Sequence, residues 1–215
     1  MPKVIANLSI SVDGFVAGPN QSLENPIGEG GMRVHEWMFA TAAWARRMGA
    51  ESIPEETADS EFVEHMHDNV GAFVMGRHMF APGRGAWDMA WRGWWGEDPP
   101  YHAPVFVLTH HAREPLPMQG GTTFHFVTEG IGSAMAQARA AAGDRDVMVA
   151  GGAGAVRQYL AAGEIDELNL HVVPLVLGSG ERLFDGLSGL RLAPAKVVAS
   201  KAVTHVTYRI SRPGD

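Results

Sequence analysis

The stretch DVMVAGGAGAVRQYL, residues 146–160, decides the fold class of this chain. It opens with a short apolar run of the kind found in buried strands, and a helix with one apolar face begins directly after Gly151-Gly152. Glycine allows positive φ and close approach to the backbone, and the free N–H groups at a helix start bind anions. The turn therefore suits a pyrophosphate. It suits equally a glycine-rich turn that packs a helix on a sheet without a ligand, and its spacing is not that of the G-x-G-x-x-G motif.

Strands and helices alternate on both sides of this stretch. The pattern predicts strands over residues 4–12, 72–75, 104–109, 122–128, 146–150, 168–177, 190–200 and 202–210, and helices over residues 32–48, 58–69, 131–142 and 153–162. Such alternation favours a mainly parallel sheet with helices on both faces. The last two strands have no helix between them, which indicates an antiparallel C-terminal edge. We therefore expect one α/β domain over residues 1–215, with three α/β/α layers and a mixed sheet.

Composition narrows the class of function. The 215 residues are 46% apolar and 19% charged, and the net charge of -7 argues against nucleic acid or an anionic membrane as the partner. No apolar run reaches the ~20 residues that span a bilayer, so we expect a soluble, cytoplasmic protein. There are no cysteines. The histidines show no H-E-x-x-H spacing, and neither His65-x-His67 nor His110-His111 makes a good chelate, so we expect no metal site.

Small or polar residues follow three further predicted strands. Gly76 and Arg77 follow one, Leu108-Thr109-His110 end another, and Gly178-Ser179-Gly180 follow a third. In open α/β sheets such residues lie in the crevice at the carboxyl ends of the strands, where ligands bind. Arg77 and His110 are candidates for pairing with nucleotide phosphates. The alternatives are a surface salt bridge for Arg77, a solvated turn at His110-His111 and a plain turn at the third strand end.

Together these motifs resemble a known family. The run VMVAGGAGAVRQYLAAGEIDELNLHVVPLVLGSGERLF, residues 147–184, is similar to the characteristic stretch of the riboflavin-biosynthesis reductase domain, which has the dihydrofolate reductase-like fold. The phrase SISVDG at residues 9–14 resembles the S-L-D-G strand end of that domain. VMGR at residues 74–77 and VLT at residues 107–109 resemble the dihydrofolate reductase branch. The resemblance covers nearly the whole chain.

The resemblance implies an NADPH-dependent reductase, a homodimer, that passes hydride to a ring or carbonyl carbon of a small substrate, similar to 5-amino-6-(5-phosphoribosylamino)uracil reductase. Such a cofactor carries the redox step and the protein orients it. The implied cofactor contacts are, for the pyrophosphate, Gly151, Gly152, Ala153, Gly154 and Val156; for the adenosine-phosphate half, Gly76, Arg77, Leu108, Thr109 and His110; and for the nicotinamide, Ala6. A nucleotide-binding protein of the same fold without turnover is the alternative.

Candidates for the substrate side lie near strand ends and in loops. Asp13 is the candidate catalytic residue, with a turn carboxylate as its alternative. Riboflavin reductases typically have a lysine six residues before this aspartate, and Asn7 stands there in this chain. Glu181, after the G-S-G turn, is a candidate substrate contact or a solvated loop acid. Trp37 and Trp87 are candidates for an aromatic wall over a planar substrate; a satellite core or a dimer contact are the alternatives. The strand over residues 168–177 is the other candidate dimer surface.

Overall fold

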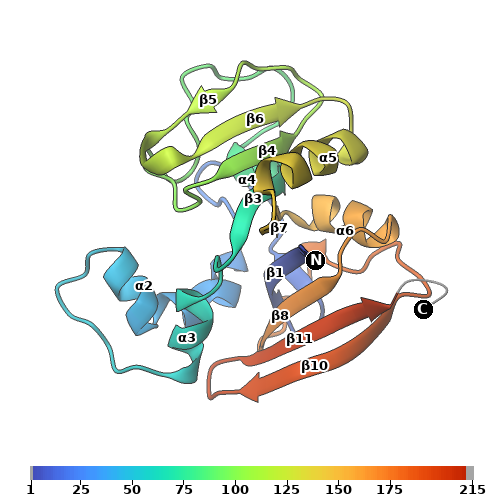
Figure 1. Ribbon diagram of the computed structural model, residues 1–215. Helices are drawn as coiled ribbons and strands as arrows, with labels where there is room; N and C mark the ends of the chain where they lie inside the picture. Colours follow the sequence, from blue (N-terminus) through green and yellow to red (C-terminus); the bar gives the residue numbers. More distant parts are fainter. Residues whose placement is uncertain (1, 212–215) are drawn as a thin grey trace.

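A nine-stranded sheet organises the computed structural model, which describes residues 2–211 (Figure 1). The strand order is β10-β11-β8-β1-β7-β3-β4-β6-β5. The strands are β1 Val4–Ser11, β3 Val70–Gly76, β4 Pro104–Leu108, β5 Leu116–Pro117, β6 Thr123–Val127, β7 Asp146–Gly151, β8 Glu167–Val173, β10 Arg191–Ala199 and β11 Thr204–Ser211. Two short strands, β2 Phe15–Ala17 and β9 Glu181–Arg182, pair separately.

The six central strands, from β8 across to β6, run parallel to one another. β11 and β10 add the antiparallel C-terminal edge, so the predicted mixed sheet is confirmed. The short β5 adds an antiparallel strand at the opposite edge, which was not predicted. All carboxyl ends of the parallel strands consequently lie at one edge of the sheet.

Helices cover both faces, as the predicted three-layer arrangement requires. α5 Ile131–Ala142 and α6 Ala153–Ala161 lie on one face, over a core to which β1 contributes alternate residues such as Val4 and Ile10. The other face carries η1 Gly31–His35, α1 Glu36–Phe39, α2 Ala42–Arg47 and α3 Ala58–Glu64 beside β8 and β11. α4 Arg77–Phe80 follows β3 directly, and η2 Gln119–Gly121 precedes β6. No helix of residues 2–211 is long and apolar enough to cross a membrane.

The helix predicted over residues 32–48 is wrong as a single element, because Thr41 interrupts it. Thr41 has an extended backbone and its side chain accepts a hydrogen bond from the N–H of Trp44 at 3.2 Å, so it caps a new helix. The strand predicted over residues 168–177 is also shorter, and ends at Val173. Pro174 lacks an N–H group to continue the ladder, and the chain turns away.

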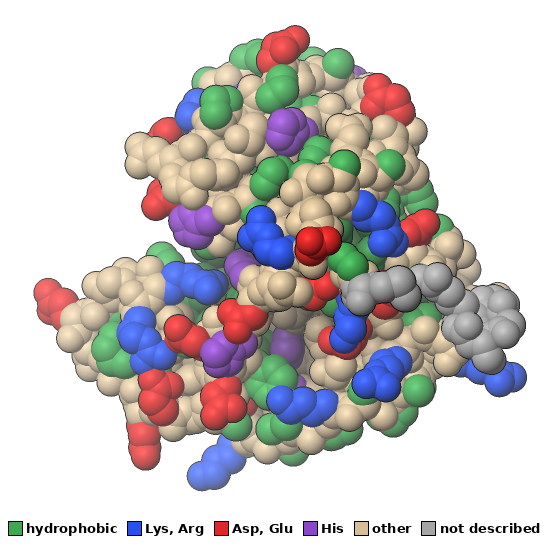
Figure 2. All heavy atoms as spheres, in the orientation of Figure 1, with side chains coloured by type: hydrophobic (Ala, Val, Ile, Leu, Met, Phe, Trp, Pro, Cys, Tyr) green, Lys and Arg blue, Asp and Glu red, His purple; other side chains and the backbone are tan. Residues whose placement is uncertain are grey.

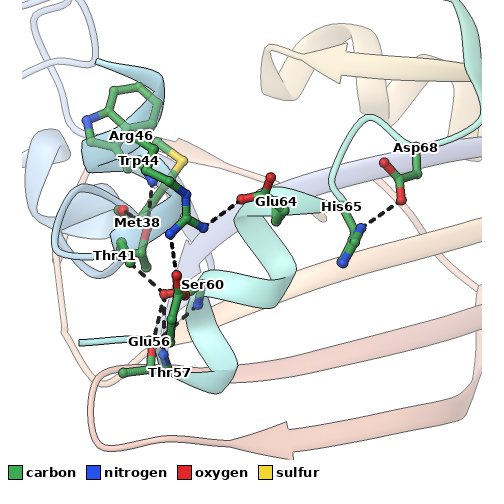
Figure 3. A network of polar contacts seen from close by, with 11 residues as sticks. Met38, Thr41, Trp44, Arg46, Glu56, Thr57, Ser60, Glu64, His65 and Asp68 are labelled. Atoms are coloured by element: carbon green, nitrogen blue, oxygen red, sulfur yellow. Dashed lines mark hydrogen bonds and ion pairs between the residues drawn. The ribbon is translucent and has the colours of Figure 1, made fainter. Parts of the chain in front are cut away.

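A polar network fixes α3 against α2 (Figure 3). Arg46 of α2 forms ion pairs with Glu56 and with Glu64, the latter at 2.9 Å. Thr57 caps α3 in a capping box with Ser60. Exposed ion pairs of this kind contribute only about 0–1 kcal/mol each. The network therefore matters mainly because it sets where α3 lies on the sheet.

The tryptophan-rich segment, residues 83–100, is mostly a satellite core, one of the predicted alternatives. Trp91 packs against the core cluster around Phe80 and donates its indole N–H to the carbonyl of Phe80 at 2.8 Å. Trp94 donates to the carbonyl of His78 and lies edge-on to Trp91. Only Trp95 of this segment leaves a large part of its ring, 44%, exposed. The predicted dimer strand is interior as well, since β8 lies between β1 and β11.

Candidate functional site

The carboxyl ends of β3, β4 and β7 bring the predicted cofactor residues together. Gly76 pairs in register with Leu108, and the preceding residue of β3 pairs with Gly151. A β-carbon on Gly76 would lie 3.6 Å from the backbone nitrogen of Gly152. Three glycines thus meet at one point of the sheet edge, and leave the backbone open where side chains would otherwise stand.

The Gly151-Gly152 turn ends β7 and starts α6. Gly151 has φ of 128°, a conformation that favours glycine, and the peptide bond between the two glycines is cis. Gly152 is the N-cap of α6 and no side chain caps the helix, so the first N–H groups have no partner within the helix. Gly154 is exposed at this helix start. The backbone of this turn is therefore suited to an anion.

Two of the predicted cofactor contacts, Val156 and Ala6, have side chains that lie inside the core. Val156 is fully buried, and its N–H already donates to the carbonyl of Gly152 at 3.2 Å. Ala6 is fully buried in mid-strand, level with Val149 of β7. Gly151 is two positions beyond Val149, so Ala6 lies roughly 7 Å below the rim of the sheet at ~3.3 Å per residue. Ala153 is also buried, and only its backbone faces the turn.

Arg77 stands at the start of α4, directly beside the glycines. Its guanidinium lies 3.7 Å from the centre of the Trp87 ring and 3.5 Å from the hydroxyl of Thr109. Its Nε is buried and has no hydrogen-bond partner, and burial lowers the pKa of this arginine. Within residues 2–211 it pairs with no carboxylate, so the expected alternative of a surface salt bridge is not what the fold builds. The positive charge of Arg77 is therefore available to pair with an anionic ligand.

Thr109 closes the turn that follows β4. Its hydroxyl accepts a hydrogen bond from the N–H of His111 at 3.1 Å, while His110 is exposed and faces solvent. Trp87 donates its indole N–H to the carbonyl of His111 at 2.7 Å. Trp87 therefore lies with Arg77 over β4 and β6, where it contacts Phe126 of β6. In the sheet, β6 is four strands from β1, which is ~19 Å at ~4.8 Å per strand. Trp87 cannot line one small substrate subsite together with Asn7, which corrects its predicted role.

Asp13 is a turn carboxylate in this structure. The Ser11 hydroxyl donates to it at 2.6 Å, and the backbone N–H groups of Leu177 and Gly178 donate at 3.0 and 2.7 Å. These hydrogen bonds, the one from Ser11 first, lower its pKa to about 2. Because both oxygens are engaged and the group stays ionised, Asp13 ties β1 to the G-S-G loop and is not suited to donate a proton.

Glu181 lies in β9, exposed, with its carboxylate 3.7 Å from the guanidinium of Arg157. Its charge also acts on His78 of α4, so it stands on the rim between α4 and α6. The structure thus favours the solvated acid over a contact inside the cleft. Trp37 is likewise corrected: it is 4% exposed and donates its indole N–H to Ser9 at 3.0 Å, which makes it part of the core.

A groove of about 320 Å³ lies on the face of the sheet opposite α5 and α6. Its floor comes from β1 and β8, with Ile5, Asn7 and His171, and its wall from Phe62 of α3 and Met66 of the turn that follows. Charged side chains of both signs gather on this side of the molecule, acidic ones mainly over α2 and α3 (Figure 2). Of the predicted substrate residues, Asn7 alone lines this groove.

The sequence reasoning missed the polar residues under this groove. His171, His205 and Asp59 are each less than a tenth exposed and form a connected chain that ends on Asn7. The sequence does hold an indication of them, because polar residues such as Ser9 and His171 stand in strands whose other residues are mostly apolar. Among residues 2–211 no three histidines or carboxylates gather as metal ligands.

The fold is an α/β domain with a glycine-rich turn that is suited to an anion, and with an arginine that pairs with no carboxylate within residues 2–211, at the carboxyl edge of its parallel strands. Residues 2–206 match the RibD C-terminal domain family, and the chain belongs to that family of riboflavin-biosynthesis reductase domains. It is on this ground an oxidoreductase family member. The sequence matches no curated protein.

Several solved structures share the fold. A putative riboflavin biosynthesis protein from Shewanella sp. PV-4 is 25% identical, with a TM-score of 0.64 over 98% of this chain and 99% of that one. The riboflavin biosynthesis reductase of Saccharomyces cerevisiae is 15% identical, with a TM-score of 0.53 over 98% and 89%. A pyrimidine reductase-like protein from Corynebacterium diphtheriae is 13% identical, with a TM-score of 0.51 over 99% and 93%. The last two are similar in fold alone.

Proposed function

We propose that this protein is an NADPH-dependent reductase of a small heterocyclic or carbonyl substrate, similar to 5-amino-6-(5-phosphoribosylamino)uracil reductase. The observation that carries the proposal is the meeting of Gly76, Arg77 and the Gly151-Gly152 turn at one sheet edge in a member of this family. A pyrophosphate fits the backbone of Gly151, Gly152, Ala153 and Gly154. The adenosine-phosphate half fits beside Arg77, Leu108, Thr109 and His110.

The unneutralised guanidinium of Arg77 supports NADPH over NADH. The 2′-phosphate of NADPH brings the negative charge and the oxygen acceptors that a buried Nε without a partner requires. Trp87 holds the guanidinium plane from one side, so the other side is left for the ligand. Bound NADPH would supply the hydride; the chain itself holds and orients the reactants and excludes water.

The substrate would bind in the groove that Asn7 lines. The groove runs along β1 and β8 from the start of β7 at Asp146, and Asn7 follows Ala6, which lies level with Val149 of β7, two positions before Gly151. A nucleotide-binding protein without turnover is the second candidate. One observation favours it: neither Asp13, held ionised in a turn, nor the exposed Glu181 is suited to donate a proton to a bound substrate.

Calorimetric titration with NADPH and with NADH tests the cofactor, and NADPH oxidation across pyrimidine, pterin and carbonyl compounds tests turnover. Micromolar binding that favours NADPH, followed by turnover of one substrate class, would support the reductase. Tight binding without turnover across the panel would favour the second candidate. No binding of either nucleotide, with an unshifted melting temperature, would remove both.

A further inference from the structure

Four polar side chains from four separate elements form one hydrogen-bonded chain beneath the groove. His171 Nε2 of β8 contacts Asn7 Oδ1 of β1, and His171 Nδ1 lies 2.6 Å from His205 Nδ1 of β11. His205 Nε2 lies 2.9 Å from Asp59 Oδ1 of α3. Asn7 and His171 both line the groove, and within residues 2–211 the Nδ2 of Asn7 bonds no other group. The chain therefore connects a buried carboxylate with an amide that faces a ligand.

Aromatic rings seal this chain from water. Trp37 lies 4.7 Å from the ring of His171 and 4.9 Å from that of His205. Phe62 stacks on His205 at 3.8 Å. His171 and His205 are 4% and 1% exposed. Because no water reaches these imidazole nitrogens, each of them needs a hydrogen-bond partner among the four side chains. The number of protons that the four side chains hold decides which atoms donate and which accept.

The proton count is definite. Three contacts need three hydrogens, but an ionised aspartate and an amide oxygen bring none, and two neutral imidazoles bring one each. A third proton completes all three hydrogen bonds, and leaves one imidazolium balanced by the carboxylate of Asp59. Without that proton, hydrogens between Asp59 and His205 and between His205 and His171 leave His171 Nε2 as an acceptor. The amide of Asn7 must then turn, so that it donates to His171 and presents its oxygen to the groove.

We propose that His171, His205 and Asp59 are positioning residues that set, through one bound proton, which end of the Asn7 amide faces the groove. With the proton bound, Asn7 offers its NH2 group to a ligand acceptor such as a ring carbonyl. With the proton lost, Asn7 offers its oxygen to a ligand N–H. The inference rests on the proposed function only in taking the groove as the substrate site.

The surroundings determine where the proton is lost. Burial lowers the pKa of both imidazoles, and each cation nearby acts in the same direction: the partner imidazole and His35 of η1 on His171, and Lys196 of β10 on His205. The hydrogen bond and charge of Asp59 oppose this at His205. The proton is consequently bound at acid pH and lost on the acid side of 6.5, the ordinary value for histidine. A ligand carbonyl on Asn7 would move the transition to higher pH.

Nuclear magnetic resonance of protein with 15N-labelled histidine and asparagine side chains tests this directly from pH 8 down to the lowest pH at which the protein stays folded, because burial lowers the pKa of His171 to about 3. We expect His171 Nε2 to change from a bare to a protonated nitrogen as pH falls, in the same transition that shifts the side-chain amide signals of Asn7. Asp59→Asn should move that transition at least one pH unit toward acid, because the imidazolium loses its counter-charge. His65→Gln, which removes an exposed histidine at the groove, should leave it unchanged.

The wild-type titration alone decides the matter if Asp59→Asn does not fold. A His171 that keeps one tautomer throughout, with unmoved Asn7 signals, overturns the inference, as does a folded Asp59→Asn variant with an unaltered transition. No nucleotide is needed for this measurement. A coupled transition in a protein that binds no NADPH would therefore remove the proposed function and leave this inference standing. NADPH binding without a coupled transition would overturn this inference and leave the proposed function standing.

Discussion

The guanidinium of Arg77 lies over the ring of Trp87, 3.7 Å from its centre, although Trp87 comes from a loop and Arg77 from the start of α4, directly after a core strand. Trp87 is itself held by its hydrogen bond to the carbonyl of His111. The turn after β4 thus fixes Trp87, and Trp87 fixes the plane of Arg77. A cation oriented in this way loses little conformational entropy when it binds an anion.

Arg77→Ala should weaken NADPH binding far more than NADH binding. A charge-assisted hydrogen bond contributes about 1.5–3 kcal/mol, which corresponds to roughly a 10- to 100-fold rise in Kd. Arg77→Lys keeps the charge without the planar fork and should lie between wild type and alanine. Calorimetric titration of each variant with both nucleotides is the measurement. Equal losses for NADPH and NADH would argue against a contact with the 2′-phosphate.

The two glycines of the turn should separate stability from binding. Gly151 has φ of 128°, and a β-carbon there would lie 3.4 Å from the sulfur of Met79, so Gly151→Ala should destabilise the fold by about 1–3 kcal/mol. Gly152 has an ordinary negative φ and its nearest neighbour would be 3.9 Å away. Gly152→Val should therefore keep the melting temperature close to wild type and still weaken NADPH binding by obstructing the backbone. A folded Gly152→Val variant with unchanged affinity would remove the pyrophosphate from this turn.

The regular elements near this turn were predictable because their signals are local. α5 has the predicted bounds, residues 131–142, since Gly130 and Gly143 with positive φ stand at its two ends. α6 likewise follows from two glycines and one apolar face. The break in the helix at Thr41 was not predicted, because the helical spacing of apolar residues continues across it. The break depends on one contact, in which the Thr41 hydroxyl accepts a hydrogen bond from the N–H of Trp44.

The site was predictable only where it depends on strand ends. Gly76, Arg77 and Gly151 meet because parallel strands end at one edge, which an alternating pattern implies. The contact between His171 and His205 depends instead on β11 pairing with β8, a long-range choice that no local pattern records. The depth of Ala6 depends likewise on the register of β1 against β7, which no local pattern records.

Trp37→Phe should cost stability and leave nucleotide binding intact. The variant removes the N–H that Ser9 accepts in a buried site, and a buried hydroxyl without its partner costs about 1–3 kcal/mol. Urea unfolding gives the free energy of unfolding, and Trp95→Phe, at a residue that is 44% exposed and whose side chain hydrogen-bonds Tyr101, is the matched control with a smaller expected loss. A Trp37→Phe variant of wild-type stability that loses turnover would restore Trp37 to the substrate wall.

Asp13→Asn should reduce stability in a pH-dependent way. The pKa of Asp13 falls to about 2 in the folded protein from 3.8 in an unperturbed chain, so the carboxylate stabilises the fold above the higher value, and this contribution is lost as pH falls toward the lower one. The variant keeps one acceptor oxygen and loses the second, which bonds the N–H of Gly178 or Leu177. We expect its melting temperature to lie below wild type by a constant amount from pH 7 to pH 5. The gap should narrow between pH 4 and pH 2.

Asp144→Asn, at an exposed position in the turn after α5, controls for the change in net charge. A gap that persisted unchanged at pH 2 would show that Asp13 acts through its shape in the turn, because a protonated wild-type carboxyl and an asparagine would then still differ.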